Sequence, residues 1–202
     1  MDSSADASGL EARKASLREA MLEARGRVSE EEVRRVGGVL CRHLLGSLAF
    51  RQSRRVALYA AQGGEPDLRS FFDQALALGK EVLLPRCGAG HQLAFHRVES
   101  WSELNPGRYG LLEPPATAPE YGPEALDLVL VPSLAVDLKG RRLGRGGGWY
   151  DRALAERQVS VGSRWVAVIH DFQRVKTDVP SGEMDQRIDG FVTEEGIFWC
   201  RD

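Results

Sequence analysis

A glycine-rich loop flanked by arginines has the residue types that most directly suggest chemistry. Residues 140–152 read GRRLGRGGGWYDR, with four glycines between positions 144 and 148. Glycine lets backbone N–H groups turn toward one centre, and a helix after the loop adds free N–H groups and the positive end of its dipole. Arg142 and Arg145 add bidentate donors suited to phosphate oxygens, and Asp151 could ligate magnesium. The loop therefore has the components of a nucleotide-phosphate site.

The loop matches neither standard nucleotide-binding template. A Walker loop needs Lys followed by Ser or Thr, and the dinucleotide fingerprint GxGxxG is also absent. Judged by its glycines alone, the loop is more simply a flexible connection. An arginine–glycine RNA-binding segment is a further interpretation, although such segments usually lie in disordered tails.

A basic helix face near the N-terminus is the second candidate site. Lys14 and Arg18 are four positions apart, so they share one helix face, and Arg25 lies two turns beyond Arg18. Such a face could bind a polyphosphate. For an isolated helix, a solvated basic face is the more common explanation.

Polar residues in loops near strand ends are weaker candidates. Glu65 lies in GGEPD, Tyr109 begins YGLLEPP, and Glu183 and Asp185 lie in PSGEMD. Each of them, taken alone, is more simply a turn or capping residue. The carboxylates become functional candidates only if they converge on the cation and the ring that other motifs imply.

Alternating helices and strands must position these residues. Helices are predicted over 10–26, from Ser29 onward with a capping box, from Asp67 to Gly79, and from about Trp149 to Arg157. The apolar stripe of the second helix consists of Val33, Val36, Leu40, Leu44 and Leu48. Strands are predicted at 55–61, 81–87, 92–98, 126–132 and 164–170, with a strand or hairpin at 190–200. This order predicts a three-layer αβα domain with a mainly parallel central sheet, whose ligands gather at the carboxyl ends of the strands.

Composition is consistent with one cytoplasmic domain. The 202 residues are 43% hydrophobic with a net charge of −2, which argues weakly against a general nucleic-acid binder. The sequence contains neither a membrane-spanning apolar run nor a signal-peptide core at its N-terminus. The three cysteines show no disulfide or zinc spacing, so we expect a reduced protein. We expect residues 1–9 to form a disordered tail and residues 10–202 a single domain.

Taken together, these segments resemble the 5-formyltetrahydrofolate cyclo-ligase family, also called methenyltetrahydrofolate synthetase. The resemblance runs in order from KASLR (14–18) to FVTE (191–194), through YAAQGGEPD, GKEVLLPR, YGLLEPP, DLVLVPSLAVDLKGRRLGRGGGWYDR and DFQRV. It implies an ATP-dependent, magnesium-requiring enzyme that converts 5-formyltetrahydrofolate to 5,10-methenyltetrahydrofolate, with release of ADP and phosphate.

The resemblance also implies roles for individual residues. Lys14 and Arg18 correspond to ATP-binding residues, and Asp151 and Asp185 to magnesium ligands. Further implied ATP-binding residues are Arg142, Leu143, Gly144, Arg145, Gly146, Gly147, Gly148, Trp149 and Tyr150. The implied folate-binding residues are Glu65, Tyr109, Arg145, Trp149 and Tyr150. Arg145 and Asp151 are the implied catalytic residues.

Four positions depart from the family pattern. Leu68 stands where threonine is frequent, Ser133 where glycine is frequent, Trp149 where tyrosine is common, and Met184 where some members have histidine. None of them removes an implied phosphate or metal group. Leu68 and Trp149 bear on the shape of the folate pocket.

Two functions of other classes stay open on the sequence. A non-catalytic nucleotide or RNA binder would lose affinity steeply with salt and need no magnesium. A sugar-phosphate isomerase or an acyl-transferase relative on a similar scaffold would need no ATP. Neither explains the basic helix pair together with the aspartate of YDR. We expect small-molecule substrates, no nucleic-acid or membrane partner, and a monomer or weak dimer.

Overall fold

The computed structural model describes residues 3–157 and 162–200, with the side chains of residues 3–7 outside that description. Its α-helices are α1 (Ser3–Gly26), α2 (Glu30–Gly46), α3 (Leu48–Gln52), α4 (Arg69–Ala77) and α5 (Trp149–Glu156). Ser29 caps α2 as predicted, because its side chain accepts a hydrogen bond from the Glu32 N–H. None of the described helices has the length and apolar character needed to cross a membrane.

An eight-stranded sheet runs through the described residues in the order β12-β11-β10-β7-β1-β2-β3-β6. Its strands are β1 (Arg55–Ala57), β2 (Glu81–Cys87), β3 (Leu93–Arg97), β6 (Glu120–Tyr121), β7 (Leu128–Pro132), β10 (Arg164–Val168), β11 (Gly190–Thr193) and β12 (Gly196–Trp199). The apolar strand β7 lies in the centre and pairs in parallel with β1 and β10. Antiparallel pairs involve β3, β6 and β12 at the two ends of the sheet. The predicted mainly parallel sheet is confirmed.

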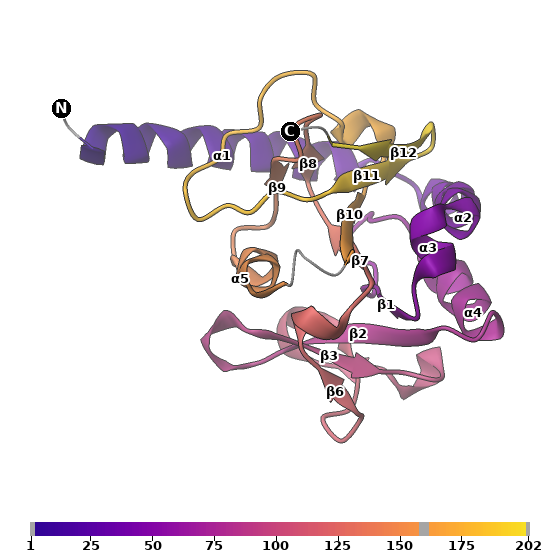
Figure 1. The fold of residues 1–202 in the computed structure, drawn as a ribbon. Coiled ribbons are helices and arrows are strands. Elements are labelled where there is room, and N and C mark those ends of the chain that lie inside the picture. Colours follow the sequence, from indigo (N-terminus) through magenta and orange to yellow (C-terminus); the bar gives the residue numbers. More distant parts are fainter. Residues whose placement is uncertain (1–2, 158–161, 201–202) are drawn as a thin grey trace.

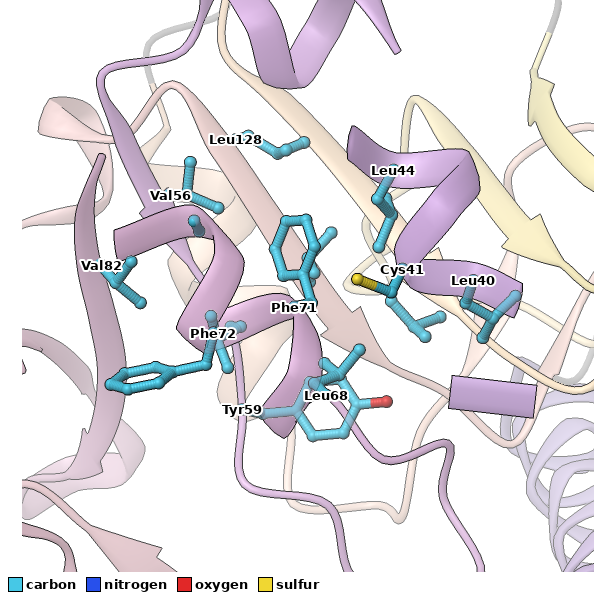
Figure 2. Packing of buried hydrophobic residues seen from close by; sticks show 14 of the residues in the cluster. Leu40, Cys41, Leu44, Val56, Tyr59, Leu68, Phe71, Phe72, Val82 and Leu128 are labelled. Carbon is cyan, nitrogen blue, oxygen red and sulfur yellow. The ribbon is translucent and has the colours of Figure 1, made fainter. Parts of the chain in front are cut away.

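Helices cover both faces of this sheet (Figure 1). On one face, Leu44 of α2 and Phe71 of α4 belong to the same buried cluster as Val56 of β1, and Figure 2 shows these side chains packing between helices and sheet. On the other face, Leu154 of α5 belongs to a second buried cluster with Trp165 of β10. Burying one large apolar side chain contributes about 1.5–3 kcal/mol, so each cluster fixes its layer firmly. The predicted three-layer αβα arrangement is confirmed.

Helix α1 packs against a short ribbon beside the sheet. The ribbon consists of β8 (Ala135–Val136) and β9 (Arg142–Leu143), and a second ribbon consists of β4 (Asn105–Pro106) and β5 (Leu112–Glu113). Leu17 and Met21 of α1 pack against Ala135, Leu143 and Val179. Because the glycine-rich loop follows β9 directly, this packing places the basic residues of α1 beside that loop.

Several details differ from the sequence-based predictions. Helix α1 begins at Ser3, so residues 3–9 are helical where a disordered tail was predicted; this segment has two alanines and no proline to oppose helix formation, while residues 1–2 lie outside the described range. Leu48 does not extend the stripe of α2, because Ser47 ends that helix and caps α3, which leaves Leu48 70% exposed. Strand β1 ends at Ala57 rather than at residue 61, although the Leu58 N–H still donates a hydrogen bond to the Leu83 carbonyl of β2.

Candidate active site

One cleft near the carboxyl ends of β1 and β7 brings the predicted site residues together. It has a volume of about 300 Å³, and α1, the turn after β1, the ribbon β8–β9 and the start of α5 contribute to its walls. The predicted residues that line it are Lys14, Arg18, Glu65, Tyr109, Arg142, Leu143, Gly144, Arg145, Gly146, Gly147, Gly148, Trp149, Tyr150, Asp151 and Asp185. Glu183 is exposed and is not among the lining residues. The convergence agrees with the expected location of a site at the strand ends.

The glycine loop (residues 144–148) needs its glycines for local geometry. Gly148 is the N-cap of α5 with φ of 66°, a left-handed conformation that favours glycine. A Cβ atom on Gly147 would lie 2.5 Å from Cδ1 of Trp149, so a side chain there would displace the indole. The Nε of Arg18 donates a 3.1 Å hydrogen bond to the Gly144 carbonyl. Arg18 therefore ties α1 to the loop.

Arg142 contributes a buried guanidinium to the cleft wall. It is 6% exposed, and its Nη2 lies 2.8 Å from Oδ1 of Asp151. This contact is an ion pair without hydrogen-bond alignment, because Nε and Nη2 have no hydrogen-bond partner among the described residues. Burial lowers the pKa of Arg142, and the negative charge of Asp151 acts in the opposite direction. Buried donors that lack partners are suited to an anionic ligand.

Lys14 is also buried, contrary to the interpretation of a solvated basic face. It is 7% exposed, and its Nζ lies 2.6 Å from Oδ2 of Asp185 and 3.3 Å from Oε1 of Glu11. Burial lowers the pKa of Lys14, but the hydrogen bonds and charges of Asp185 and Glu11 outweigh it, so the net shift is upward. Lys14 is therefore an ammonium ion held at the cleft by two carboxylates.

The two implied magnesium ligands, Asp151 and Asp185, lie on chain segments that a hydrogen bond joins. Oδ1 of Asp151 accepts a 3.1 Å hydrogen bond from the N–H of Gln186, the residue after Asp185. Within residues 3–157 and 162–200, no group of three or more His, Cys, Asp and Glu side chains gathers to hold a metal by itself. Magnesium usually binds through one or two carboxylates, water and nucleotide phosphates. The donor set therefore fits a magnesium ion that binds together with a nucleotide.

Glu65 lies between two arginines in the turn after β1. Its Oε1 is 3.2 Å from Nη2 of Arg25 and 3.7 Å from Nη2 of Arg145. Its Oε2 accepts a 3.0 Å hydrogen bond from the Gln62 N–H. Glu65 is 7% exposed, so the turn presents a mostly buried acceptor at the cleft.

Aromatic side chains gather around Trp149 at the cleft. Its ring centroid lies 4.9 Å from that of His91 and 6.4 Å from that of Tyr109. Tyr109 is 70% exposed and has φ of 57°, an uncommon value for a non-glycine residue. Burial, followed by the charge of Glu65, raises the pKa of Tyr150 well above its ordinary range. These rings can stack on a flat ligand, as the sequence suggested.

Comparison with known proteins agrees with this geometry. The family model that matches the chain is described as the 5-formyltetrahydrofolate cyclo-ligase family, and the match spans residues 10–194. The chain belongs to this family. As a member of the cyclo-ligase family, it is an enzyme and a ligase, and the family implies the use of ATP.

Individual cyclo-ligases match most of the chain. The 5-formyltetrahydrofolate cyclo-ligase of Mycolicibacterium smegmatis is 36% identical over 198 residues, which cover 93% of this chain and 97% of that protein. The Escherichia coli K12 cyclo-ligase is 33% identical over 147 residues, covering 71% of this chain and 79% of that protein.

Solved structures have the same fold. The NMR structure of Aquifex aeolicus 5,10-methenyltetrahydrofolate synthetase is 35% identical, with a TM-score of 0.81 over 94% of this chain and 93% of that chain. The Mycoplasma pneumoniae 5,10-methenyltetrahydrofolate synthetase is 20% identical with a TM-score of 0.70, over 88% of this chain and 96% of that chain. At this lower identity, the similarity to the Mycoplasma pneumoniae structure supports the fold alone.

The departures from the cyclo-ligase pattern have different structural consequences. Leu68 is fully buried in the same core cluster as Tyr59 (Figure 2), and it is not among the residues that line the cleft. Met184 is 84% exposed and does not line it either. Ser133 and Trp149 do line the cleft, so only these two departures can alter its shape directly.

Sequence reasoning missed several cleft residues. Arg25 was noted only for its spacing from Arg18, yet it is 1% exposed and lines the cleft. Glu113, in YGLLEPP, is buried and accepts a hydrogen bond from the Cys87 N–H. The hydroxyls of Tyr59 and Ser133 are buried without a hydrogen-bond partner among the described residues. No spacing in the sequence could have identified these two hydroxyls, because their burial depends on the packing of adjacent strands.

Proposed function

We propose that this cyclo-ligase converts 5-formyltetrahydrofolate and ATP to 5,10-methenyltetrahydrofolate, ADP and phosphate, with magnesium as the metal. The observation that carries the proposal is a single cleft lined at once by a cationic loop and helix, two aspartates, a carboxylate turn and aromatic rings. The cationic loop and helix and the two aspartates are suited to a metal nucleotide, and the carboxylate turn and the aromatic rings are suited to a pterin. A nucleotide or RNA binder does not need the second set.

The cationic groups account for the binding of ATP. Lys14, Arg142 and Arg145 supply charged donors, and the glycine loop and the N-terminus of α5 supply backbone N–H groups. Phosphoryl transfer needs mainly alignment and neutralisation of charge, which these groups provide without a nucleophilic side chain. Asp151 and Asp185 would hold magnesium, which neutralises phosphate charge when it is bound.

Glu65 and the aromatic residues account for the binding of folate. The Glu65 carboxylate can accept hydrogen bonds from the amino group and the ring N–H of a pterin. Trp149, Tyr150 and Tyr109 offer rings on which the pterin can stack. Arg145 lies 3.7 Å from Glu65 and belongs to the glycine loop, so it stands between the two ends of the cleft.

The reaction then proceeds in two steps. The formyl oxygen attacks the γ-phosphorus of ATP, the bond to the β,γ-bridging oxygen breaks, and ADP leaves. The formyl group becomes an imidate-like phosphate. Its oxygen, which was a poor leaving group, can now leave as phosphate. N10 of the folate attacks the activated carbon, the C–O bond breaks, phosphate leaves, and N10 loses its proton to solvent or phosphate. The cleft residues align the two substrates and neutralise charge in both steps.

Purified protein with ATP, magnesium and 5-formyltetrahydrofolate tests the proposal. The near-ultraviolet absorbance of the methenyl product should rise only when all three are present, with ADP formed in equal amount. Product formation without ATP, or ATP hydrolysis that is indifferent to the folate, would contradict the proposed function.

A further inference from the structure

Arg25 joins the end of α1 to the turn that carries Glu65. Its Nε donates a 3.0 Å hydrogen bond to the Gly63 carbonyl, and its Nη2 donates a 3.3 Å hydrogen bond to the Gln62 carbonyl. The same Nη2 lies 3.2 Å from Oε1 of Glu65. One guanidinium group thus engages two backbone carbonyls and the carboxylate of a single four-residue turn (residues 62–65).

The turn is packed tightly against α1. Gly63 and Gly64 have φ of 58° and 77°, and a Cβ atom on Gly64 would lie 2.6 Å from the Arg25 carbonyl oxygen. On another side of the turn, Nε2 of His170 lies 2.9 Å from the Gly64 carbonyl oxygen. The backbone of residues 62–64, directly before Glu65, is therefore held by Arg25 and His170, and of these two residues Arg25 also contacts the carboxylate.

This use of a buried arginine carries an energetic cost. Burial lowers the pKa of Arg25, and the charge of Glu65 opposes that shift. A buried ion pair is weak evidence for stability, because the desolvation of both charges offsets their attraction. Its retention is better explained if the Glu65 carboxylate itself must have a fixed position. Glu65 lines the cleft and faces Arg145 with the same oxygen that faces Arg25.

We propose that Arg25 is a positioning residue for the folate substrate, which fixes the 62–65 turn and aims the Glu65 carboxylate at the pterin end of the cleft. The inference rests on the proposed function, since it takes Glu65 as the acceptor of the pterin donors. According to this inference, Arg25 affects the binding of folate and not the binding of ATP. Lys14 and Arg142, which carry the nucleotide end, have other partners, Asp185 and Asp151.

Arg25→Met tests this role through the separate Michaelis constants of the two substrates. Loss of a charge-assisted contact should raise the KM for folate roughly 10- to 100-fold. The KM for ATP should stay within about threefold, because the hydrogen bonds and the ion pair that the Arg25 side chain makes among the described residues all go to the 62–65 turn. Arg27→Met, directly after the end of α1, is the matched control: its partner is Glu23, and both side chains are exposed, so both constants should stay at the wild-type level.

Coupling with Glu65 separates positioning from general damage. In a Glu65→Gln background, Arg25→Met should raise the folate KM by much less than it does in the wild type, because the aimed charge is already gone. If Arg25→Met does not fold, Arg25→Lys decides the matter. Lysine keeps the charge but loses the fork that reaches both carbonyls, so its folate KM should rise by a smaller factor with the ATP KM unchanged.

A folded Arg25→Met variant with an unchanged folate KM would overturn the inference, as would an equal rise in both constants. An equal effect of Arg25→Met with and without Glu65→Gln would also overturn it. Where Arg25→Lys has to stand in for an unfolded variant, unchanged folate kinetics would do the same. Wild-type protein without cyclo-ligase activity would instead refute the proposed function, so the two failures are distinct.

Discussion

Replacement of Asp151 by asparagine should cost more stability than a helix-terminal aspartate normally does. An acidic residue in the first turn of a helix contributes at most about 1 kcal/mol through the helix dipole. Asp151 has that position in α5, but it is also the ionic partner of Arg142, whose side chain is 3% exposed. The substitution would therefore leave a buried guanidinium without a compensating charge.

The size of the effect follows from the exposure of the two partners. Removing one partner of a fully buried pair costs about 3–5 kcal/mol. The Asp151 side chain is 23% exposed, and asparagine can still accept the hydrogen bond from the Gln186 N–H. Both facts reduce the cost, so we expect a loss of about 1–3 kcal/mol in the free energy of unfolding. For a chain of this length, that loss lowers Tm by about 2–12 °C.

Thermal and urea unfolding of the variant, in the absence of nucleotide, measure this directly. Combining Asp151→Asn with Arg142→Met should recover part of the loss, because the double variant no longer buries an unpaired charge. Glu23→Gln, which breaks the exposed pair with Arg27, is the control and should change the free energy of unfolding by less than about 1 kcal/mol. An unchanged Tm for Asp151→Asn, or a double variant less stable than the single one, would show that Asp151 does not compensate the buried charge of Arg142. Because Asp151 is also a proposed magnesium ligand, Asp151→Asn should need a higher magnesium concentration for half-maximal activity. A magnesium titration of activity would measure this shift.

Three further predictions concern the nucleotide end, the glycine loop and the cleft thiol. Lys14→Ala should lower kcat/KM for ATP by about one to two decades with little change in the folate KM, whereas Lys139→Ala, in an exposed pair, should leave the steady-state kinetics unchanged. Gly148→Ala should cost about 1–2 kcal/mol in urea unfolding through its left-handed φ, in contrast to Gly38→Ala, where an added Cβ has nothing within 4 Å. Burial and Glu113 raise the pKa of Cys87 from 9.0 to about 11, so its contribution to stability is complete below pH 9 and is lost as the pH rises toward 11. Unfolding curves should therefore show a smaller alkaline loss for Cys87→Ser than for the wild type, and equal losses would contradict the assignment.

The architecture could be predicted because its signals are local. The apolar run at 128–132 predicted a buried parallel strand, and Ser29 predicted the start of a helix through a capping preference. Once the strands are parallel, their carboxyl ends meet, so the motif residues that follow them converge without further information. The extent of α1 and the exposure of Leu48 were predicted wrongly, because the first has no strong boundary signal and the second depends on a capping serine inside an apolar stripe.

Ionic partnerships in the cleft could not be predicted in this way. Arg25 meets Glu65 across forty positions of sequence, and Lys14 meets Asp185 across a still longer separation. No helical or strand period connects such residues; the contacts exist because α1 packs its apolar side against the β8–β9 ribbon. That packing also explains why Lys14 lies in the cleft wall rather than in solvent.

These ion pairs balance the buried charges of the cleft. Lys14 faces Asp185, and Arg142 faces Asp151. Without the aspartates, these buried cations would lose the compensating charge that burial requires. Under the proposed function, magnesium and phosphate are each attracted to one member of the same pairs, so a metal nucleotide can replace both partners together. Free ATP would meet cations already paired with carboxylates and would bring no charge to engage those carboxylates. The pairing therefore favours the metal complex over free nucleotide, which is the preference that a magnesium titration at fixed ATP would detect.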